Sequence, residues 1–327
     1  MEGVAALAGR VRGNVERVIV GKGEVIDLAF VALLCEGHVL IEDVPGIGKT
    51  MLAKALARSI GCTFRRIQCT PDLLPSDITG LYFFNQRMQE FEFRAGPIFA
   101  QIVLADEINR ATPRTQAALL EAMQEQQVTV EGTTLPLARP FLVLATQNPI
   151  ELQGTFPLPE AQLDRFLMRL SLGYPDPEGE REILRRFTSG DPLEALEPVA
   201  SAEDLRESGR RVRQVLVSPA VEDYIIAIAR ETRRHPEIEL GMSPRGTLAL
   251  HRTSQALAAV RGRTFVLPDD VKVLAPVVIP HRLILSTHAR LRERSAREIA
   301  EEIVRAVPAP VEQEARDGRP PGRRPGV

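Results

Sequence analysis

Several kinds of residue and segment are scarce in this chain of 327 residues, and each absence narrows what the protein can be. It has no tryptophan, and only 5% of it is aromatic, which leaves little material for stacking on nucleic-acid bases. It has no run of 18 apolar residues, so we expect no membrane span. The 41 basic and 43 acidic residues give a formal net charge of -2, which excludes a global positive field for nucleic acid or an anionic membrane.

Cysteine is also scarce, and Cys35, Cys62 and Cys69 show no paired spacing of a zinc site or a disulfide framework. We therefore expect reduced thiols and a cytoplasmic protein. The first 21 residues place apolar side chains at helical spacing between charges, which predicts an amphipathic helix rather than a signal peptide.

The first half of the chain alternates short apolar runs with helical stretches, the pattern of an α/β fold with a parallel sheet and crossover helices. The strands are predicted at Val39–Glu42, Phe64–Gln68, Ile102–Ala105, Phe141–Thr146 and Met168–Leu172. The helices are predicted at Lys22–Cys35, Lys49–Ile60, Pro97–Gln101, Pro113–Gln124 and Glu160–Asp164. Two segments, 81–93 and 128–137, predict β-hairpins that interrupt this alternation.

The pattern changes near 173–177, and beyond it we find helical periodicity without a convincing central strand. The helices are predicted at Gly179–Phe187, Ala202–Gln214, Pro219–Arg233, Pro244–Arg261, Pro268–Ala275 and Ala296–Arg305. After 307 the chain is rich in proline, glycine and arginine, which predicts disorder. We therefore expect a core of 1–173, an all-helical lid of 174–307 and a disordered tail of 308–327.

The most informative segment is IEDVPGIGKT at 41–50, which ends in the Gly-Lys-Thr of a phosphate-binding loop. A predicted strand leads into it and a predicted helix leaves it, which is the context that such a loop requires. Backbone N–H groups and the positive end of the helix would surround the phosphates of ATP or ADP. Lys49 would reach the β- and γ-phosphates, and the Thr50 hydroxyl would ligate Mg²⁺.

One position in this loop departs from the strict motif, because Asp43 stands where glycine is expected and puts a negative charge near the phosphates. The segment 18–21 ahead of the first core helix could place backbone against adenine, although an ordinary apolar turn is the alternative. The predicted nucleotide-binding residues are Val20, Gly21, Pro45, Gly46, Ile47, Gly48, Lys49, Thr50, Met51 and Asp106.

Two carboxylates follow the apolar strand Ile102–Ala105, at the end of the strand where open α/β sheets place their ligands. Asp106 would join Thr50 in holding Mg²⁺, through water, and Glu107 would polarise the water that attacks the γ-phosphate. The alternative is an acidic loop after a core strand, but the phosphate-binding loop favours the catalytic interpretation.

Three further residues are candidates for catalysis. Asn148 follows an apolar strand and could hydrogen-bond the attacking water or the γ-phosphate, or could simply form a turn before proline. Arg165 could act in trans on transition-state charge, whereas a surface ion pair with Asp164 is the simpler explanation of its spacing. Arg245 lies in the first turn of a predicted helix, where the dipole opposes a cation, so a nearby phosphate would stabilise it.

With these residues assembled, the chain resembles the MoxR family of AAA+ ATPases over about residues 10–305. The segments that carry the resemblance are LIEDVPGIGKT, GPIFAQIVLADEINRATPRTQAALLEAMQE, VLATQNPIELQGTFPLPEAQLDRFLMRL and GMSPRG. The resemblance implies an AAA+ core with a helical lid and a ring homo-oligomer, usually a hexamer. Asp43 is similar to the looser first position of the loop in that family.

The resemblance also implies roles for single residues and for partners. Asn148 would be sensor 1, Arg165 the arginine finger and Arg245 sensor 2. The two hairpins would be insertions that face the central pore. Family members look like chaperones that mature client protein complexes or insert metal cofactors, often with a partner that bears a von Willebrand factor A domain.

Other functions compete with this one. A nucleic-acid motor or loader has little support in the near-neutral charge and the few aromatic residues. A nucleotide-gated scaffold without turnover is disfavoured by the complete carboxylate pair. A chelatase-type ATPase subunit is a close relative of the favoured function, and the sequence separates the two poorly.

Overall fold

The computed structural model describes residues 1–149, 154–188 and 190–310. Most of the predicted disordered tail, from 311 onward, lies outside the described residues. Within the described ranges, no helix is long and apolar enough to cross a membrane.

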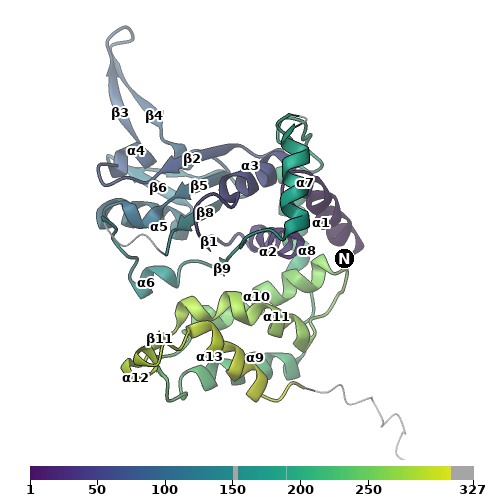
Figure 1. The fold of residues 1–327 in the computed structure, drawn as a ribbon. Coiled ribbons are helices and arrows are strands. Elements are labelled where there is room, and N and C mark those ends of the chain that lie inside the picture. Colours follow the sequence, from purple (N-terminus) through teal and green to yellow (C-terminus); the bar gives the residue numbers. More distant parts are fainter. Residues whose placement is uncertain (150–153, 189, 311–327) are drawn as a thin grey trace, which may run out of the picture.

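A five-stranded parallel sheet forms the centre of the first half (Figure 1). Its strands are β1 (Val39–Glu42), β2 (Phe64–Gln68), β5 (Ile102–Asp106), β8 (Leu142–Gln147) and β9 (Met168–Leu170). They run in the order β2-β5-β8-β1-β9, and every neighbouring pair is parallel. The five predicted strands are therefore confirmed, with ends that differ by at most two residues.

Alternate residues of these strands enter two separate apolar cores, which is why the strands read as continuous apolar runs. Ile102 and Leu104 of β5 face the core that holds α1 (Glu2–Val15), α2 (Gly23–Leu34) and α3 (Lys49–Ser59). Val103 faces the other core, with α4 (Pro75–Thr79) and α5 (Pro113–Glu125).

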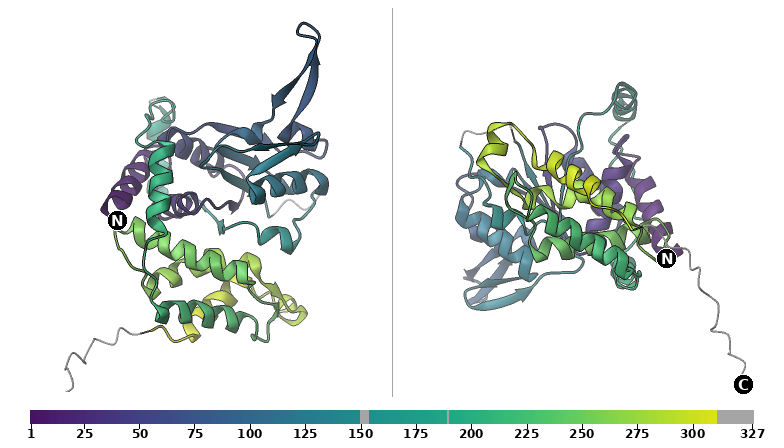
Figure 2. Two further views of the ribbon diagram at one scale, coloured as in Figure 1. Left: turned by 180° about the vertical axis from the view of Figure 1, so that it is seen from behind. Right: turned by 90° about the horizontal axis from the view of Figure 1, so that it is seen from below.

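The predicted hairpins are both present, as β3 (Gly80–Asn85) with β4 (Glu90–Ala95) and β6 (Gln127–Val130) with β7 (Thr133–Pro136). The first projects far from the body of the molecule (Figures 1 and 2). At its base, a side chain on Gly80 would meet the carbonyl oxygen of Arg94 at 2.3 Å, and one on Gly96 would meet that of Ile78 at 2.1 Å. Neither position has room for a side chain, so the close backbone approach at the base of the hairpin requires glycine at both.

The segment around 97–101 was predicted as a helix, but the structure has only the 3-10 turn η1 (Pro97–Phe99). Ala100 returns to extended backbone there because the chain must enter β5 two residues later. Another 3-10 turn, η2 (Ile108–Arg110), follows β5, and the short helix α6 (Glu160–Leu163) precedes β9.

The second half is helical, and each predicted helix is present. Its longer helices are α7 (Pro177–Thr188), α8 (Ala202–Val212), α9 (Pro219–Thr232), α10 (Pro244–Val260), α11 (Pro268–Val278) and α13 (Ala296–Ala306). The sequence did not predict α12 (Thr287–Leu291), η3 (Pro280–Arg282) or the antiparallel pair β10 (Ile238–Leu240) with β11 (Ile284–Leu285).

Two details of this half differ from expectation. The helix α11 continues three residues past its predicted end and contains Pro276, because the backbone N–H of Ile279 still reaches the carbonyl of Ala275. The helix α7 stands beside α1 (Figures 1 and 2), and Arg186 of α7 donates to the carbonyl of Glu16. The division of the chain at 173/174 stays a prediction.

Candidate active site

The loop between β1 and α3 is held by glycines with left-handed backbone. Gly46 has φ +84° and Gly48, the residue that precedes α3, has φ +94°, values that other residues rarely adopt. The first N–H groups of α3 have no acceptor within their own helix, and the helix dipole adds positive potential there. The loop therefore has the form of a phosphate cradle.

The carboxylate of Asp43 turns away from this cradle. Its Oδ2 accepts hydrogen bonds from the Ser171 hydroxyl at 2.8 Å and from the backbone N–H groups of Leu172 at 2.7 Å and Gly173 at 2.8 Å. Burial would raise the pKa of Asp43, but these hydrogen bonds and one from Val44 outweigh it and hold the pKa below its usual value. The negative charge that seemed out of place thus anchors the chain after β9.

Lys49 lies over the loop, and its ammonium donates to the backbone carbonyl of Asp43 at 2.6 Å. Burial lowers the pKa of Lys49, while the charges of Asp43, Asp106 and Glu107 oppose that shift. The lysine therefore interacts electrostatically with both predicted carboxylates.

A pocket of about 370 Å³ adjoins the loop. The predicted residues that line it are Val20, Pro45, Gly46, Ile47, Gly48 and Met51. Gly21 has φ +69° but does not line it, and Lys49, Thr50 and Asp106 lie outside its lining too. The sequence analysis missed the opposite wall, formed by Tyr174 and by Ile183 and Phe187 of α7.

The predicted carboxylate pair lies at the carboxyl end of β5. Thr146 of β8 links the pair, because its hydroxyl donates to Asp106 at 2.6 Å and accepts from the backbone N–H of Glu107 at 2.8 Å. Glu107 has left-handed backbone, with φ +56°. Since β8 separates β5 from β1, Thr146 connects the carboxylates with the strand that feeds the loop.

Two residues of β2 that the sequence analysis did not select also contact these carboxylates. Arg66 donates to Asp106 Oδ2 through Nη2 at 2.6 Å and through Nε at 3.0 Å. Gln68 donates to Glu107 Oε2 at 3.3 Å. Both residues lie at the end of β2, which pairs with β5 in the sheet. The sequence does not reveal this pairing, so it gave no signal that could have selected Arg66 and Gln68.

Asn148 follows the last residue of β8 and is half-buried at the same edge of the sheet. Its strand lies between those of the loop and of the carboxylates, so Asn148 follows β8 at the same end of the sheet as both. The role itself stays a prediction.

Arg165 and Arg245 lie elsewhere, and both line a second pocket of about 440 Å³. Arg165 precedes β9, and His38, which lines the same pocket, precedes β1. Because the strands are parallel, this pocket lies at their amino ends, whereas the loop and the carboxylates lie at their carboxyl ends. The two pockets have no lining residue in common.

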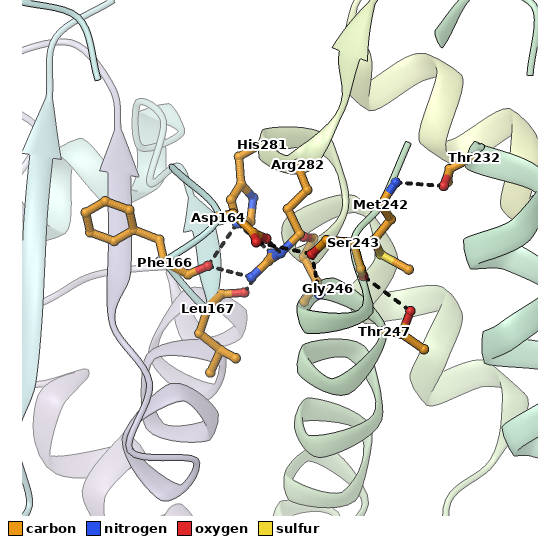
Figure 3. Close-up of polar contacts among 11 residues, drawn as sticks. Asp164, Phe166, Leu167, Thr232, Met242, Ser243, Gly246, Thr247, His281 and Arg282 are labelled. Atoms are coloured by element: carbon orange, nitrogen blue, oxygen red, sulfur yellow. Dashed lines mark hydrogen bonds and ion pairs between the residues drawn. The ribbon is translucent and has the colours of Figure 1, made fainter. Parts of the chain in front are cut away.

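An ion pair between Asp164 and Arg282 joins the two halves (Figure 3), next in the chain to Arg165. Asp164 accepts from Arg282 Nε at 2.9 Å and from Ser243, the capping residue of α10, at 3.1 Å. Asp164 therefore pairs with Arg282 and not with Arg165, which removes the simpler explanation of the Arg165 position.

The same junction is strongly buried. Arg282 also donates to the carbonyl of Phe166 at 2.6 Å, and burial lowers its pKa to about 10. His281 lies beside it, with Nε2 3.1 Å from the Phe166 carbonyl, and burial lowers the pKa of His281 well below its usual value. The lid is thus attached to the chain segment that carries Arg165.

Comparisons with known proteins agree with this architecture. Residues 38–168 match the ATPase family associated with various cellular activities (AAA), and residues 230–303 match the AAA lid domain. The chain is similar to the uncharacterized protein YeaC of Bacillus subtilis, at 50% identity over 96% of this chain and 98% of that one.

Two further similarities cover nearly the whole chain. Chaperone MoxR1 of Mycobacterium tuberculosis is 42% identical, over 91% of this chain and 81% of its own. A solved structure from Cytophaga hutchinsonii has a TM-score of 0.88 at 40% identity, over 95% of this chain and 98% of that one. The resemblance predicted from the motifs is therefore confirmed: the chain belongs to the MoxR family of AAA+ ATPases, enzymes that hydrolyse ATP.

Proposed function

We propose that this chain hydrolyses ATP at the junctions of a ring homo-oligomer, usually a hexamer in this family, and uses the energy to remodel client proteins. The single observation that carries the proposal is the separation of the two pockets. Lys49 and Glu107 lie at the carboxyl end of the sheet, and Arg165 and Arg245 lie at the amino end. A complete site then needs the loop of one copy and the arginines of another.

Each residue has a distinct task in this proposal. Lys49 and the first turn of α3 bind the phosphates, and Glu107 takes the proton from the attacking water. Asn148 orients that water as sensor 1. Arg165 and Arg245 of the adjoining copy stabilise the charge that develops on the phosphates, as arginine finger and sensor 2.

The residues also fit Mg²⁺, which would neutralise charge on the β- and γ-phosphates. Thr50 and Asp106 supply hard oxygen donors at one edge of the sheet, and no group of three His, Cys, Asp or Glu side chains in the described ranges could form a metal cage of protein alone. An ion held by one or two protein oxygens, water and phosphate suits this donor set.

The hairpin β3–β4 is the element that we propose contacts the client. Five large apolar side chains on it are exposed: Leu81 at 43%, Phe83 at 40%, Phe84 at 46%, Met88 at 64% and Phe91 at 70%. Exposed apolar side chains of this size mark interaction surfaces. The name of the relative Chaperone MoxR1 points the same way. From the resemblance to the family alone, we further propose a partner with a von Willebrand factor A domain and clients that receive metal cofactors.

The test is the substitution Glu107→Gln, studied with ATP and Mg²⁺. We expect ATP binding to persist while turnover falls by roughly 10²–10⁴-fold, because the general base is lost. In wild-type protein, activity per subunit should rise with concentration, and sedimentation with ATP should show assembly. Undiminished turnover in the variant, or activity that is independent of concentration, would refute the proposal.

A further inference from the structure

Besides Arg165, Arg245 and the ion-paired Arg282, the same pocket is lined by Arg252, on the same helix as Arg245. Arg252 is exposed, and Arg245 is exposed as well. Seven residues separate them, which places both on one face of α10, about 10 Å apart along its axis. The pocket therefore presents a row of guanidinium groups rather than a single one.

These three arginines lack counter-charges in the described part of the chain. No carboxylate there forms an ion pair with Arg165, Arg245 or Arg252, in contrast to Arg282 in the same pocket. The two carboxylates that line the pocket are engaged, Asp164 by Arg282 at 2.9 Å and Glu36 by Arg139 at 3.6 Å.

The helix itself adds to the positive potential. Ser243 caps α10, and its hydroxyl accepts from the N–H of Gly246 at 3.3 Å, so Arg245 lies in the first turn of the helix, at the positive end of its dipole. A dipole end and three unpaired cations repel one another, and an anion that enters removes that cost. The structure thus provides a site for an anion that the chain does not supply itself.

The spacing of Arg245 and Arg252 along α10 indicates which kind of anion the pocket would bind. A single phosphate would satisfy the first turn of α10, but the row continues two turns further to Arg252. A polyphosphate chain with its attached ribose suits such a row better, and guanidinium groups bind phosphate oxygens in bidentate fashion.

We infer that Arg252 is a third residue that contacts the nucleotide bound by the adjoining copy, on the part of its polyphosphate chain remote from the γ-phosphate. This inference rests on the proposed function, since it requires a junction between copies. It extends that function by one residue and implies that Arg252 contributes to ATP-dependent assembly as well as to turnover.

The experiment uses the hydrolysis-blocked Glu107→Gln protein, with and without Arg252→Gln, and the control Arg297→Gln on the exposed surface of α13. Dilute protein reports the Kd of its own loop for a fluorescent ATP analogue. Sedimentation reports the concentration at which ATP drives assembly. We expect Arg252→Gln to leave that Kd unchanged and to raise the assembly midpoint by about ten- to a hundredfold, the loss expected for one charged hydrogen-bonding partner.

Further variants and conditions distinguish the possible outcomes of this experiment. Arg252→Lys should recover part of the loss, and Arg297→Gln should have no effect. An unchanged midpoint in Arg252→Gln, or a midpoint raised equally without nucleotide, would overturn the inference. The inference would also be overturned if dilute Lys49→Ala protein binds ATP and the double variant Lys49→Ala, Arg252→Gln does not. The arginines would then form an independent polyphosphate site.

Failure of the proposed function is visible separately. If Glu107→Gln alone does not assemble with ATP, the ring junction itself is wrong, and no Arg252 variant is needed to see it. If it assembles and Arg252→Gln behaves like Arg297→Gln, only the inference about Arg252 fails.

Discussion

The two ends of the central sheet differ in how their charges are satisfied. At the carboxyl end, the charged groups of the predicted site have partners within the chain: Lys49 on the Asp43 carbonyl, Asp106 with Arg66, and Asp43 on the backbone after β9. At the amino end, three arginines without an ion pair among the described residues line a pocket whose two carboxylates pair with Arg282 and Arg139. We therefore expect the carboxyl end to bind nucleotide within a single copy, and we propose that the arginines of the amino end meet their counter-charge in an adjoining copy.

The largest effect that would test this difference is the loss of Arg165. We expect Arg165→Ala to lower turnover by about 10³-fold or more, the range known for arginine fingers, with ATP binding by dilute protein unchanged. Turnover is measured by phosphate release and binding by a fluorescent ATP analogue. Mixing with Lys49→Ala subunits should restore part of the activity.

The matched control for that variant is Arg297→Ala, which removes the same charge from a distant lid helix. If dilute Arg165→Ala loses ATP binding in proportion to its activity, the two ends belong to one site within the chain and the comparison is wrong.

A smaller effect should appear with pH, because the amino end contains buried neutral histidines. Burial lowers the pKa of His38 to about 4, from an ordinary 6.5. Its Nδ1 accepts from the Val143 N–H at 3.0 Å, so its Nε2 donates to the Met123 carbonyl at 2.8 Å. The unfolded chain takes up a proton below pH 6.5 and the folded chain does not, so stability is complete above 6.5 and falls toward pH 4.

For His38 alone, this loss amounts to at most about 3 kcal/mol of unfolding free energy at pH 4. Denaturant unfolding between pH 7 and 4 measures it. Glutamine can replace both hydrogen bonds, so His38→Gln should flatten part of the profile. His281 contributes in the same direction. Asp43 keeps its contribution until the pH falls below the ordinary Asp value, so a profile unchanged by His38→Gln would contradict this assignment.

The smallest effect concerns the carboxyl end. We expect Asp43→Ala to lower the free energy of unfolding by about 1 kcal/mol, because three hydrogen bonds to the chain after β9 are lost from a partly exposed carboxylate. The wall formed by Tyr174 should then loosen, which raises KM for ATP by a few-fold with little change in kcat. Ser171→Ala removes a single donor and serves as the milder comparison. A lower KM would show that the charge of Asp43 does repel phosphate.

The sequence by itself determined the parts of the site that are contiguous in the chain. The loop at 41–50 and the pair at 106–107 were predicted because a strand, a turn and a helix start are encoded by adjacent residues, whose backbone geometry and apolar pattern are local. The five strands and most helices follow from the same local periodicity.

Only the tertiary structure decided what meets these segments. Packing distant segments brings Arg66 and Thr146 to Asp106, turns the Asp43 carboxylate toward 171–173, and places α7 across the nucleotide pocket. It also put Arg165 and Arg245 at the far end of the sheet from Lys49. Those positions depend on strand order and on the buried pair of Asp164 with Arg282, long-range interactions that local spacing in a sequence does not encode.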